Sequence, residues 1–199
     1  MHIVIVYHFT RNSVKHINIY HNEVGFLCSL YIVHWFTFNP HMSHPDIEFL
    51  SNDYSSLTSR SLQDRIALGS RILRSNKYFW QIRIDQYDDQ SDPAFGIASY
   101  DICKDQRLGQ DSKSWCMYID HQRSWFMHNN QHRTRLNRGI QHGSVVGILV
   151  DFETKVLKFF LDDQEHGTMK LIDLQENEIY YPAVSLNKNV HVTLLTDVK

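Results

Sequence analysis

The sequence contains few cysteines and no long hydrophobic segment, and both deficits limit where the protein can act. Its three cysteines, Cys28, Cys103 and Cys116, are far apart and form no CxxC pair. An odd, sparse set of this kind argues against a disulfide framework and favours a reducing compartment, so we predict a cytoplasmic location. The mainly apolar run 24–36 has thirteen residues, whereas a membrane-spanning helix needs about 20. We therefore expect no membrane span.

The chain also lacks an excess of basic residues. Lysine and arginine total 20 against 22 aspartates and glutamates, and the sequence pI is about 6.7. Without a basic field over the whole molecule, only a local patch could bind nucleic acid. Hydrophobic residues make up 42% of the chain and charged residues 21%. These fractions are typical of a folded globular protein and exclude a disordered one.

Composition divides the 199 residues into two unequal parts. Residues 1–36 are rich in isoleucine, valine, tyrosine and histidine, and we interpret them as a short N-terminal extension. From residue 37 onward, short runs of β-branched and aromatic residues alternate with turn signals. This pattern indicates an all-β fold, a two-sheet antiparallel β-sandwich of the jelly-roll kind. The expected strands cover residues 78–84, 94–100, 115–119, 124–128, 144–152, 155–163, 180–186 and 190–196.

Motifs of common enzyme and cofactor sites are absent from the sequence. It contains no GxSxG, HExxH or GxGxxG motif and no P-loop, and the nearest phosphate-loop lookalike, residues 109–114, lacks the first glycine. His128 and His132 are four residues apart, but this spacing suits a metal site only on a helix face. We therefore predict that the chain is not an enzyme and that it holds neither a metal nor a cofactor.

Two polar segments leave alternatives open. Residues 85–92 contain four aspartates without the spacing and glycine of an EF-hand. They are a solvated loop, a weak Ca²⁺ site or a partner contact. Arg133, Arg135 and Arg138 follow a pair of aromatic residues, a composition similar to that of single-stranded RNA grooves. RNA binding is therefore the alternative function, although the acidic segment would repel phosphate and nucleic acid is not the expected partner.

Four motifs, in order and with plausible spacing, resemble those of the B30.2 (PRY–SPRY) domain. The match extends over residues 37–198, with a PRY-like part at 37–75 and a SPRY part at 76–198, within a domain at 37–199. The motifs are FNP with HPDIEFLSND (38–53), YFWQIRID (78–85), VVGILVDFETKVLKFFLDD (145–163) and YYPAVSL (180–186).

A narrower likeness concerns residues 92–130. They resemble the SPRY domain of tripartite-motif (TRIM) RING-type ubiquitin ligases that carry a COS box and a fibronectin type III domain, and the neuronal members come closest. The resemblance implies a module that recognises the substrate or partner of such a ligase. The chain has no Cys/His set that could hold the zinc ions of a RING. Ligase activity would therefore need a longer protein.

The candidate binding residues come partly from the resemblance and partly from local physics. Trp125 and Phe126 are adjacent in a strand and must point to opposite faces, so one of them is a candidate partner anchor. Trp80 and Trp115 are expected in the core. The resemblance implies recognition by loops at one edge of the sandwich, here the segments 85–92, 101–114 and 129–139. The candidate partner-binding residues are Tyr87, Asp88, Asp89, Arg123, Trp125, Phe126, Asn129, Asn130 and Arg133.

The expected partner is a protein or a peptide, and the expected state of the domain is monomeric.

Overall fold

A computed structural model describes residues 5–6, 18–19, 32–33, 36–175 and 177–195. Most of the predicted extension, including most of the apolar run, lies outside these residues. Within it, β1 (Ile5–Val6) pairs with β2 (Asn18–Ile19), and β3 (Ile32–Val33) pairs in parallel with β7 (Lys77–Gln86). The single helix of the described part is the 3-10 turn η1 (Pro40–Met42). The rest of this part is built from strands and their connections.

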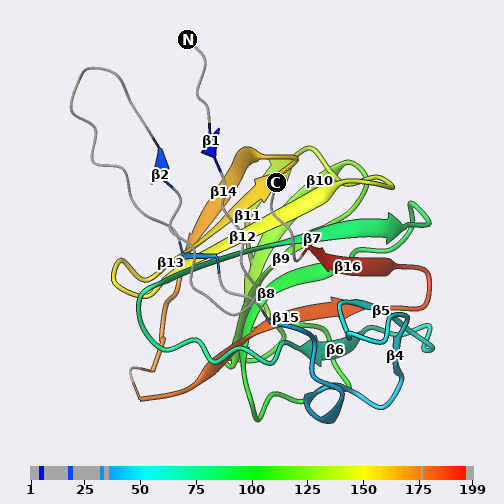
Figure 1. Cartoon of the computed structure of the whole chain (residues 1–199). Helices are drawn as coiled ribbons and strands as arrows, with labels where there is room; N and C mark the ends of the chain where they lie inside the picture. The colour runs from blue at the N-terminus through cyan, green and yellow to red at the C-terminus, as the bar shows by residue number, and fades with distance from the viewer. Residues whose placement is uncertain (1–4, 7–17, 20–31, 34–35, 176, 196–199) are drawn as a thin grey trace.

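Two large antiparallel sheets stack on one another (Figure 1). The predicted all-β, two-sheet sandwich is therefore confirmed. The six-stranded sheet has the order β11 (Gln131–Asn137), β10 (Arg123–His128), β9 (Ser114–Ile119), β8 (Ala94–Ser99), β15 (Tyr180–Leu186) and β6 (Arg65–Leu68). The second sheet has the order β14 (Gln164–Lys170), β13 (Val156–Leu161), β12 (Val145–Asp151), β7, β16 (His191–Leu195), β5 (Ser56–Ser59) and β4 (Ile47–Phe49), with β3 beside β7.

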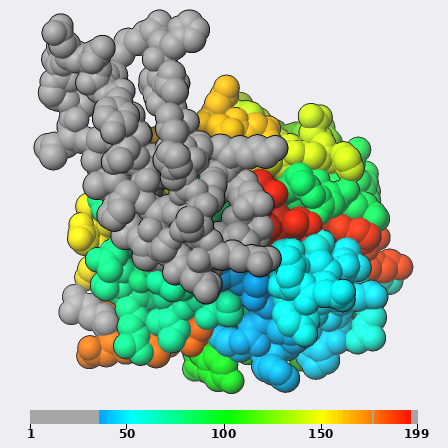
Figure 2. All heavy atoms as spheres, in the orientation of Figure 1, coloured from blue at the N-terminus to red at the C-terminus, as the bar shows by residue number. Residues whose placement is uncertain are grey.

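Segments far apart in the sequence close the second sheet. β16, near the C-terminus, pairs on one side with β7 and on the other with β5. In the space-filling view the red of β16 lies against the cyan of the β4–β5 segment (Figure 2). The PRY-like part and the SPRY part therefore share one sheet.

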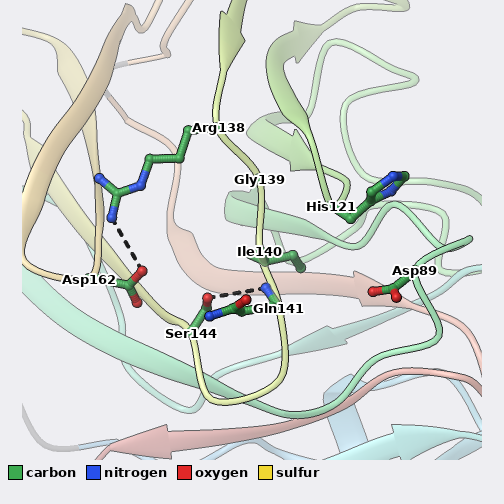
Figure 3. A pocket seen from close by; sticks show the side chains of 8 residues that line it. All are labelled: Asp89, His121, Arg138, Gly139, Ile140, Gln141, Ser144 and Asp162. Atoms are coloured by element: carbon green, nitrogen blue, oxygen red, sulfur yellow. Dashed lines mark hydrogen bonds and ion pairs between the residues drawn. The ribbon is translucent and has the colours of Figure 1, made fainter.

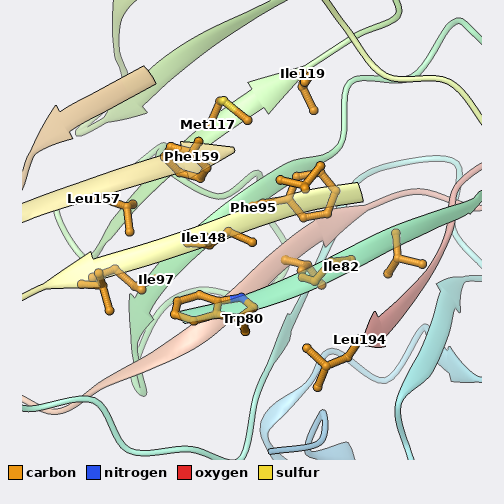
Figure 4. Close-up of a cluster of buried hydrophobic side chains, with 14 of the residues drawn as sticks. Trp80, Ile82, Phe95, Ile97, Met117, Ile119, Ile148, Leu157, Phe159 and Leu194 are labelled. Atoms are coloured by element: carbon orange, nitrogen blue, oxygen red, sulfur yellow. The ribbon is translucent and has the colours of Figure 1, made fainter. Parts of the chain in front are cut away.

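The core lies between the two sheets and follows the alternation of the strands (Figure 4). On β7, Trp80 and Ile82 are buried, and they stand opposite Ile148 and Val146 of β12. Trp115 of β9 is also buried, so the prediction that Trp80 and Trp115 are core residues is confirmed. Successive residues of a strand point to opposite sides, so every second side chain of these strands faces the core.

The outer face of the six-stranded sheet has a smaller apolar cluster of its own. The connection between β8 and β9 folds back over this face and contributes Ile102 and Leu108. The Leu108 carbonyl accepts a hydrogen bond of 2.8 Å from the Tyr118 hydroxyl, and the Arg107 guanidinium lies 5.4 Å from the centre of the Tyr118 ring. All six residues of β8 are buried because both of its faces are covered.

Every predicted strand is present, but the prediction that 129–139 is a surface loop is wrong. Asn129 and Asn130 have positive φ values of 50° and 56°, the conformation of a two-residue hairpin turn, which asparagine tolerates. The chain therefore reverses at once, and residues 131–137 form β11. Its residues alternate poorly between polar and apolar because β11 is an edge strand with little buried surface.

The connections gather at two ends of the sandwich. We use the term cleft end for the end formed by the connections 87–93, 120–122, 138–144 and 162–163. The far end comprises the turns 129–130 and 152–155 with the segments 69–76 and 171–175. The β7–β8 and β15–β16 connections lie together at the right of Figure 1, where Ser91 and Asn187 share a side-chain hydrogen bond.

Candidate partner-binding site

The hairpin of β10 and β11 separates the predicted site residues. Arg123 stands opposite Asn137 at the cleft end, whereas His128 stands opposite Gln131 at the far end. Asn129 and Asn130 follow His128 and therefore lie a full strand away from Arg123. The segments 85–92 and 129–130 are accordingly at opposite ends, so the expectation that they form one surface is wrong.

Trp125 and Phe126 point to opposite faces, as predicted. Phe126 is 1% exposed and packs in the main core, with its ring centre 5.7 Å from that of Phe159. Trp125 faces outward and is half-buried, stacked between Tyr118 at 5.8 Å and His132 at 6.2 Å. Phe126 therefore cannot touch a partner without unfolding, and Trp125 is the outward aromatic of the pair.

Asn129 and Asn130 form the turn between β10 and β11 at the far end. Their backbone N–H groups donate hydrogen bonds of 2.9 Å to the carbonyls of Asp111 and Gly109. These bonds fasten the hairpin turn to the covering connection between β8 and β9. The turn is therefore part of the internal hydrogen-bond network, although the two side chains are exposed.

The segment 87–91 is a shaped loop at the cleft end. The Tyr87 hydroxyl donates a hydrogen bond of 2.7 Å to the Ser91 carbonyl. The Asp88 carboxylate accepts from the N–H groups of Gln90 at 3.1 Å and Ser91 at 2.9 Å. Burial alone would raise the pKa of Asp88, but hydrogen bonds from the Ser91 side chain and from these two N–H groups outweigh it and lower the pKa. Tyr87 and Asp88 thus hold the loop, which presents Asp89 at a positive φ of 57°.

Four carboxylates lie near the Tyr87 phenol. Burial raises the pKa of the Tyr87 phenol well above its ordinary value, and nearby carboxylates raise it further, Asp120 most among them. The other contributing carboxylates are those of Asp88, Asp89 and Asp92. A negative surrounding disfavours the phenolate because it brings like charges together.

The cleft end contains an open hollow of about 530 Å³ (Figure 3). Each connection of this end contributes to its wall, and no single strand forms it. Arg138 forms an ion pair of 3.3 Å with Asp162 and donates a hydrogen bond of 2.8 Å to Gln164. The residues that line the hollow are Asp89, His121, Arg138, Gly139, Ile140, Gln141, Ser144 and Asp162.

Gly139 sets the shape of this hollow. A Cβ atom at Gly139 would lie 2.0 Å from the Asp120 carbonyl oxygen and 2.2 Å from the carbonyl carbon of His121. Only a residue without a Cβ lets the β11–β12 connection approach the β9–β10 turn this closely. The Ile140 N–H then donates to the Asp120 carbonyl at 2.9 Å, which fixes the two walls against each other.

Of the predicted residues, only Asp89 lines the hollow. Arg123 borders it two residues after His121, and its guanidinium pairs with Asp120 at 2.8 Å. The sequence analysis missed His121, Gln141, Ser144 and Asp162 as site residues, and it assigned Arg138 to a different role. No local pattern marks them, because four connections that are distant in the sequence bring them together.

Arg133, Arg135 and Arg138 do not form one basic stripe. Arg133 stands opposite Phe126 and Arg135 stands opposite Trp125, so the two guanidinium groups leave β11 on opposite faces. Arg138 is engaged with Asp162 at the hollow. The geometry therefore gives no continuous cationic track for a nucleic-acid backbone.

The described part of the chain contains no group of three or more histidine, cysteine or acidic side chains placed to hold a metal ion. No helix within these residues has the length and apolar character that a membrane crossing requires.

Comparison with known proteins identifies the family. The model of the SPRY domain matches residues 77–198. The chain belongs to the SPRY domain family. Its sequence is 39% identical over 166 residues to the E3 ubiquitin-protein ligase TRIM9 of Drosophila melanogaster, a match that covers 82% of this chain and 22% of TRIM9. It is 29% identical over 126 residues to the human fibronectin type III and SPRY domain-containing protein 2, which covers 61% of this chain and 16% of that protein.

Solved SPRY structures share the fold. The PSpry domain of TRIM65 superposes with a TM-score of 0.68 at 14% identity and covers 83% of this chain and 91% of that one. The SPRY domain of human HERC1 gives a TM-score of 0.67 at 17% identity, with coverage of 81% and 99%. The SPRY domain is a protein-interaction module, so partner binding is the general function of this chain. The chain spans about a fifth of the length of TRIM9.

Proposed function

We propose that this SPRY domain recognises a protein or peptide segment in the hollow of the cleft end, as the substrate-recognition part of a TRIM-type ubiquitin ligase. The observation that carries the proposal is the hollow itself, whose walls come from the connections 87–93, 120–122, 138–144 and 162–163. Loops held by a rigid sandwich commonly carry recognition, because they vary without disturbing the core. The identity of 39% with TRIM9 supports the ligase context.

The predicted residues take different roles in this proposal. Asp89 contacts the partner directly, and Arg123 borders the contact. Tyr87 and Asp88 position Asp89 through their bonds within the loop. Trp125 is a flanking contact on the outer face of the six-stranded sheet. The proposal places no chemistry on the partner within this chain, and the free thiols of Cys103 and Cys116 suit a cytoplasmic setting.

A random dodecapeptide phage library panned on the full chain tests the recognition. Peptides that bind the wild type should lose affinity for the double variant His121→Ala/Gln141→Ala, which removes two exposed side chains of the hollow. A matched control, Glu153→Ala/Thr154→Ala, alters the exposed far-end turn and should keep the affinity. Equal binding to all three proteins would contradict the assignment of the hollow.

The ligase context has a separate test. Incubation of this polypeptide with ubiquitin, an activating enzyme and a conjugating enzyme should yield no ubiquitin chains. Proximity labelling in cells with the proteasome inhibited should find ubiquitin-bearing neighbours of the wild type that are absent for His121→Ala/Gln141→Ala. Ubiquitin transfer by the polypeptide alone, or cleft-dependent neighbours that never carry ubiquitin, would argue against this part of the proposal.

A further inference from the structure

The charges that line the hollow are not balanced. The lining contains two carboxylates, those of Asp89 and Asp162, and one guanidinium, that of Arg138. Asp162 and Arg138 form an ion pair with each other. Among the described residues, the Asp89 side chain forms no hydrogen bond and no ion pair. Of the two carboxylates that line the hollow, that of Asp89 is therefore the one without an ion-pair partner in the lining.

The arginines around the hollow are already engaged elsewhere. Arg83 pairs with Asp85 at 2.6 Å, and Arg123 pairs with Asp120 at 2.8 Å. Neither can turn to Asp89 without giving up its present carboxylate. Asp89 therefore has no ion-pair partner among the described residues.

The position of Asp89 suits contact with a bound group. Asp89 and the Arg138–Asp162 pair stand on opposite sides of the hollow, with Gly139 and Ile140 between them (Figure 3). The bonds of Tyr87 and Asp88 hold the loop backbone in place. The loop that carries the Asp89 carboxylate is therefore held in one conformation, which lowers the entropy that binding would cost.

We propose that the partner segment places a lysine or arginine side chain in this hollow, with its cationic head paired to Asp89. This inference rests on the proposed function, because it names the chemistry of the partner recognised there. An acidic segment would have to approach Asp89 and Asp162 and could bind Arg138 only by breaking the existing ion pair.

The simpler explanation is that Asp89 is a turn residue. Aspartate and asparagine both tolerate positive φ, so an aspartate at φ 57° can serve the backbone alone. Under that explanation Asp89→Asn changes nothing in binding, because asparagine keeps the conformation and loses only the charge. The same substitution under our proposal removes the counter-ion of the partner. Asp89→Asn therefore separates the two explanations without disturbing the fold.

The experiment uses the same dodecapeptide library, panned in parallel on the wild-type chain of 199 residues and on Asp89→Asn. Peptides selected by the wild type should share lysine or arginine at one fixed position, and those selected by the variant should lack it. The strongest wild-type peptide is then synthesised, and its affinity is measured by fluorescence anisotropy. We expect Asp89→Asn to weaken it about tenfold, the size typical of a partly desolvated charge pair.

Two controls make the measurement specific. Asp173→Asn changes an exposed aspartate of the far end that also has positive φ, 62°, and should leave the affinity unchanged. Replacing the peptide's basic residue with norleucine should weaken binding to the wild type by the same factor as Asp89→Asn, and combining both changes should add little. Such non-additivity shows that the two groups pair with each other.

The outcomes distinguish this inference from the proposed function. If selected peptides lose binding to His121→Ala/Gln141→Ala but carry no shared basic residue, or bind Asp89→Asn within twofold of the wild type, the inference is wrong and the proposed function stands. If no selected peptide depends on the hollow, both are wrong. A tenfold loss with Asp89→Asn that is equal to the loss with Asp173→Asn would also overturn the inference.

Discussion

The two ends of this sandwich are built from the same strands but treat their polar groups differently. At the far end, several polar groups bond to other groups of the protein, although the Nε2 atom of His128 is buried without a partner. The indole Nε1 of Trp115 donates to the Ile172 carbonyl at 3.0 Å, and Asp151 accepts from the Glu153 N–H at 3.0 Å while its carboxylate pairs with Lys77. At the cleft end, within the described residues, the side chains of Asp89 and His121 form no such bond.

The difference shows how one fold separates stability from recognition. Groups with internal hydrogen bonds, such as Trp115 and Asp151, have little to offer a partner, since a group already bonded gains little from exchanging one bond for another. Polar groups at the cleft end that have no bond within the protein can still bond to a partner. The hollow that exposes them contributes no buried apolar surface to the core. Substitutions at the far end should therefore change stability and spare binding, and those that alter the hollow at the cleft end should change binding as well.

The largest effect on stability is expected from Trp115→Ala at the far end. Trp115 stacks on His128 at 4.5 Å and meets Tyr180 edge-on at 5.5 Å. Loss of a buried aromatic side chain costs about 3–5 kcal/mol of unfolding free energy, measured by urea denaturation. Trp115→Phe keeps a ring but leaves the Ile172 carbonyl without its donor, at about 1 kcal/mol. The affinity of Trp115→Phe for a selected peptide should equal that of the wild type. A large loss of affinity would show that the far end also takes part in binding.

The next largest effect belongs to the cleft end. Gly139→Ala forces a Cβ against the Asp120 carbonyl oxygen, so the β9–β10 turn and the β11–β12 connection must separate. We expect roughly 1–3 kcal/mol of destabilisation, typical of overpacking, together with loss of peptide binding. Gly143 offers the contrast, because nothing lies within 4 Å of a Cβ there and its strain is that of φ +86° alone. Destabilisation by Gly143→Ala without loss of binding would sharpen the assignment, whereas intact binding by Gly139→Ala would contradict it.

The strands that the sequence predicted share one physical property. Strands such as β7 and β12 bury one face, so their apolar residues alternate and can be recognised locally. β11 and β14 are edge strands with mostly exposed residues, and β4 is only three residues long. None of these shows a pattern that distinguishes a strand from a loop.

The site was less accessible to prediction than the fold, for a reason of topology. Alternation required that Trp125 and Phe126 face opposite ways, but only the packing of the second sheet shows that Phe126 is the buried one. The turn preference of asparagine is compatible with the chain reversal at Asn129 and Asn130. It could not show that this turn lies at the far end, because the register of β10 and β11 determines which connections meet.

A smaller effect is expected from Asn130 at the far-end turn. Its φ of 56° lies in the left-handed region, where a residue with a Cβ and no polar side chain loses about 1 kcal/mol. Asn130→Ala should therefore lower the free energy of unfolding by about that amount, while Asn130→Gly should be close to neutral. Both variants should bind a selected peptide as the wild type does. Weakened binding by either would show that the far end takes part in recognition.

The smallest effect should come from pH, through a hydrogen bond that joins the two sheets near the cleft end. His166 of β14 and Ser124 of β10 are joined by a hydrogen bond of 2.6 Å. Burial lowers the pKa of His166 from its ordinary value of 6.5, and the positive charge of Arg138 lowers it further. The unfolded chain then binds the proton more readily than the folded one. The stability of the folded form is therefore complete above pH 6.5 and falls as the pH drops below it.

The His166→Gln variant isolates this contribution, since glutamine keeps a polar contact with Ser124 and does not titrate. Urea midpoints of both proteins, measured between pH 8 and pH 5, should draw apart on acidification, with the wild type losing more. Because Arg138 lines the hollow and its charge acts on His166, the same acidification should weaken peptide binding more in the wild type than in His166→Gln. Parallel midpoints would show that protonation of His166 does not act on the fold, and the cleft end would then be independent of this hydrogen bond.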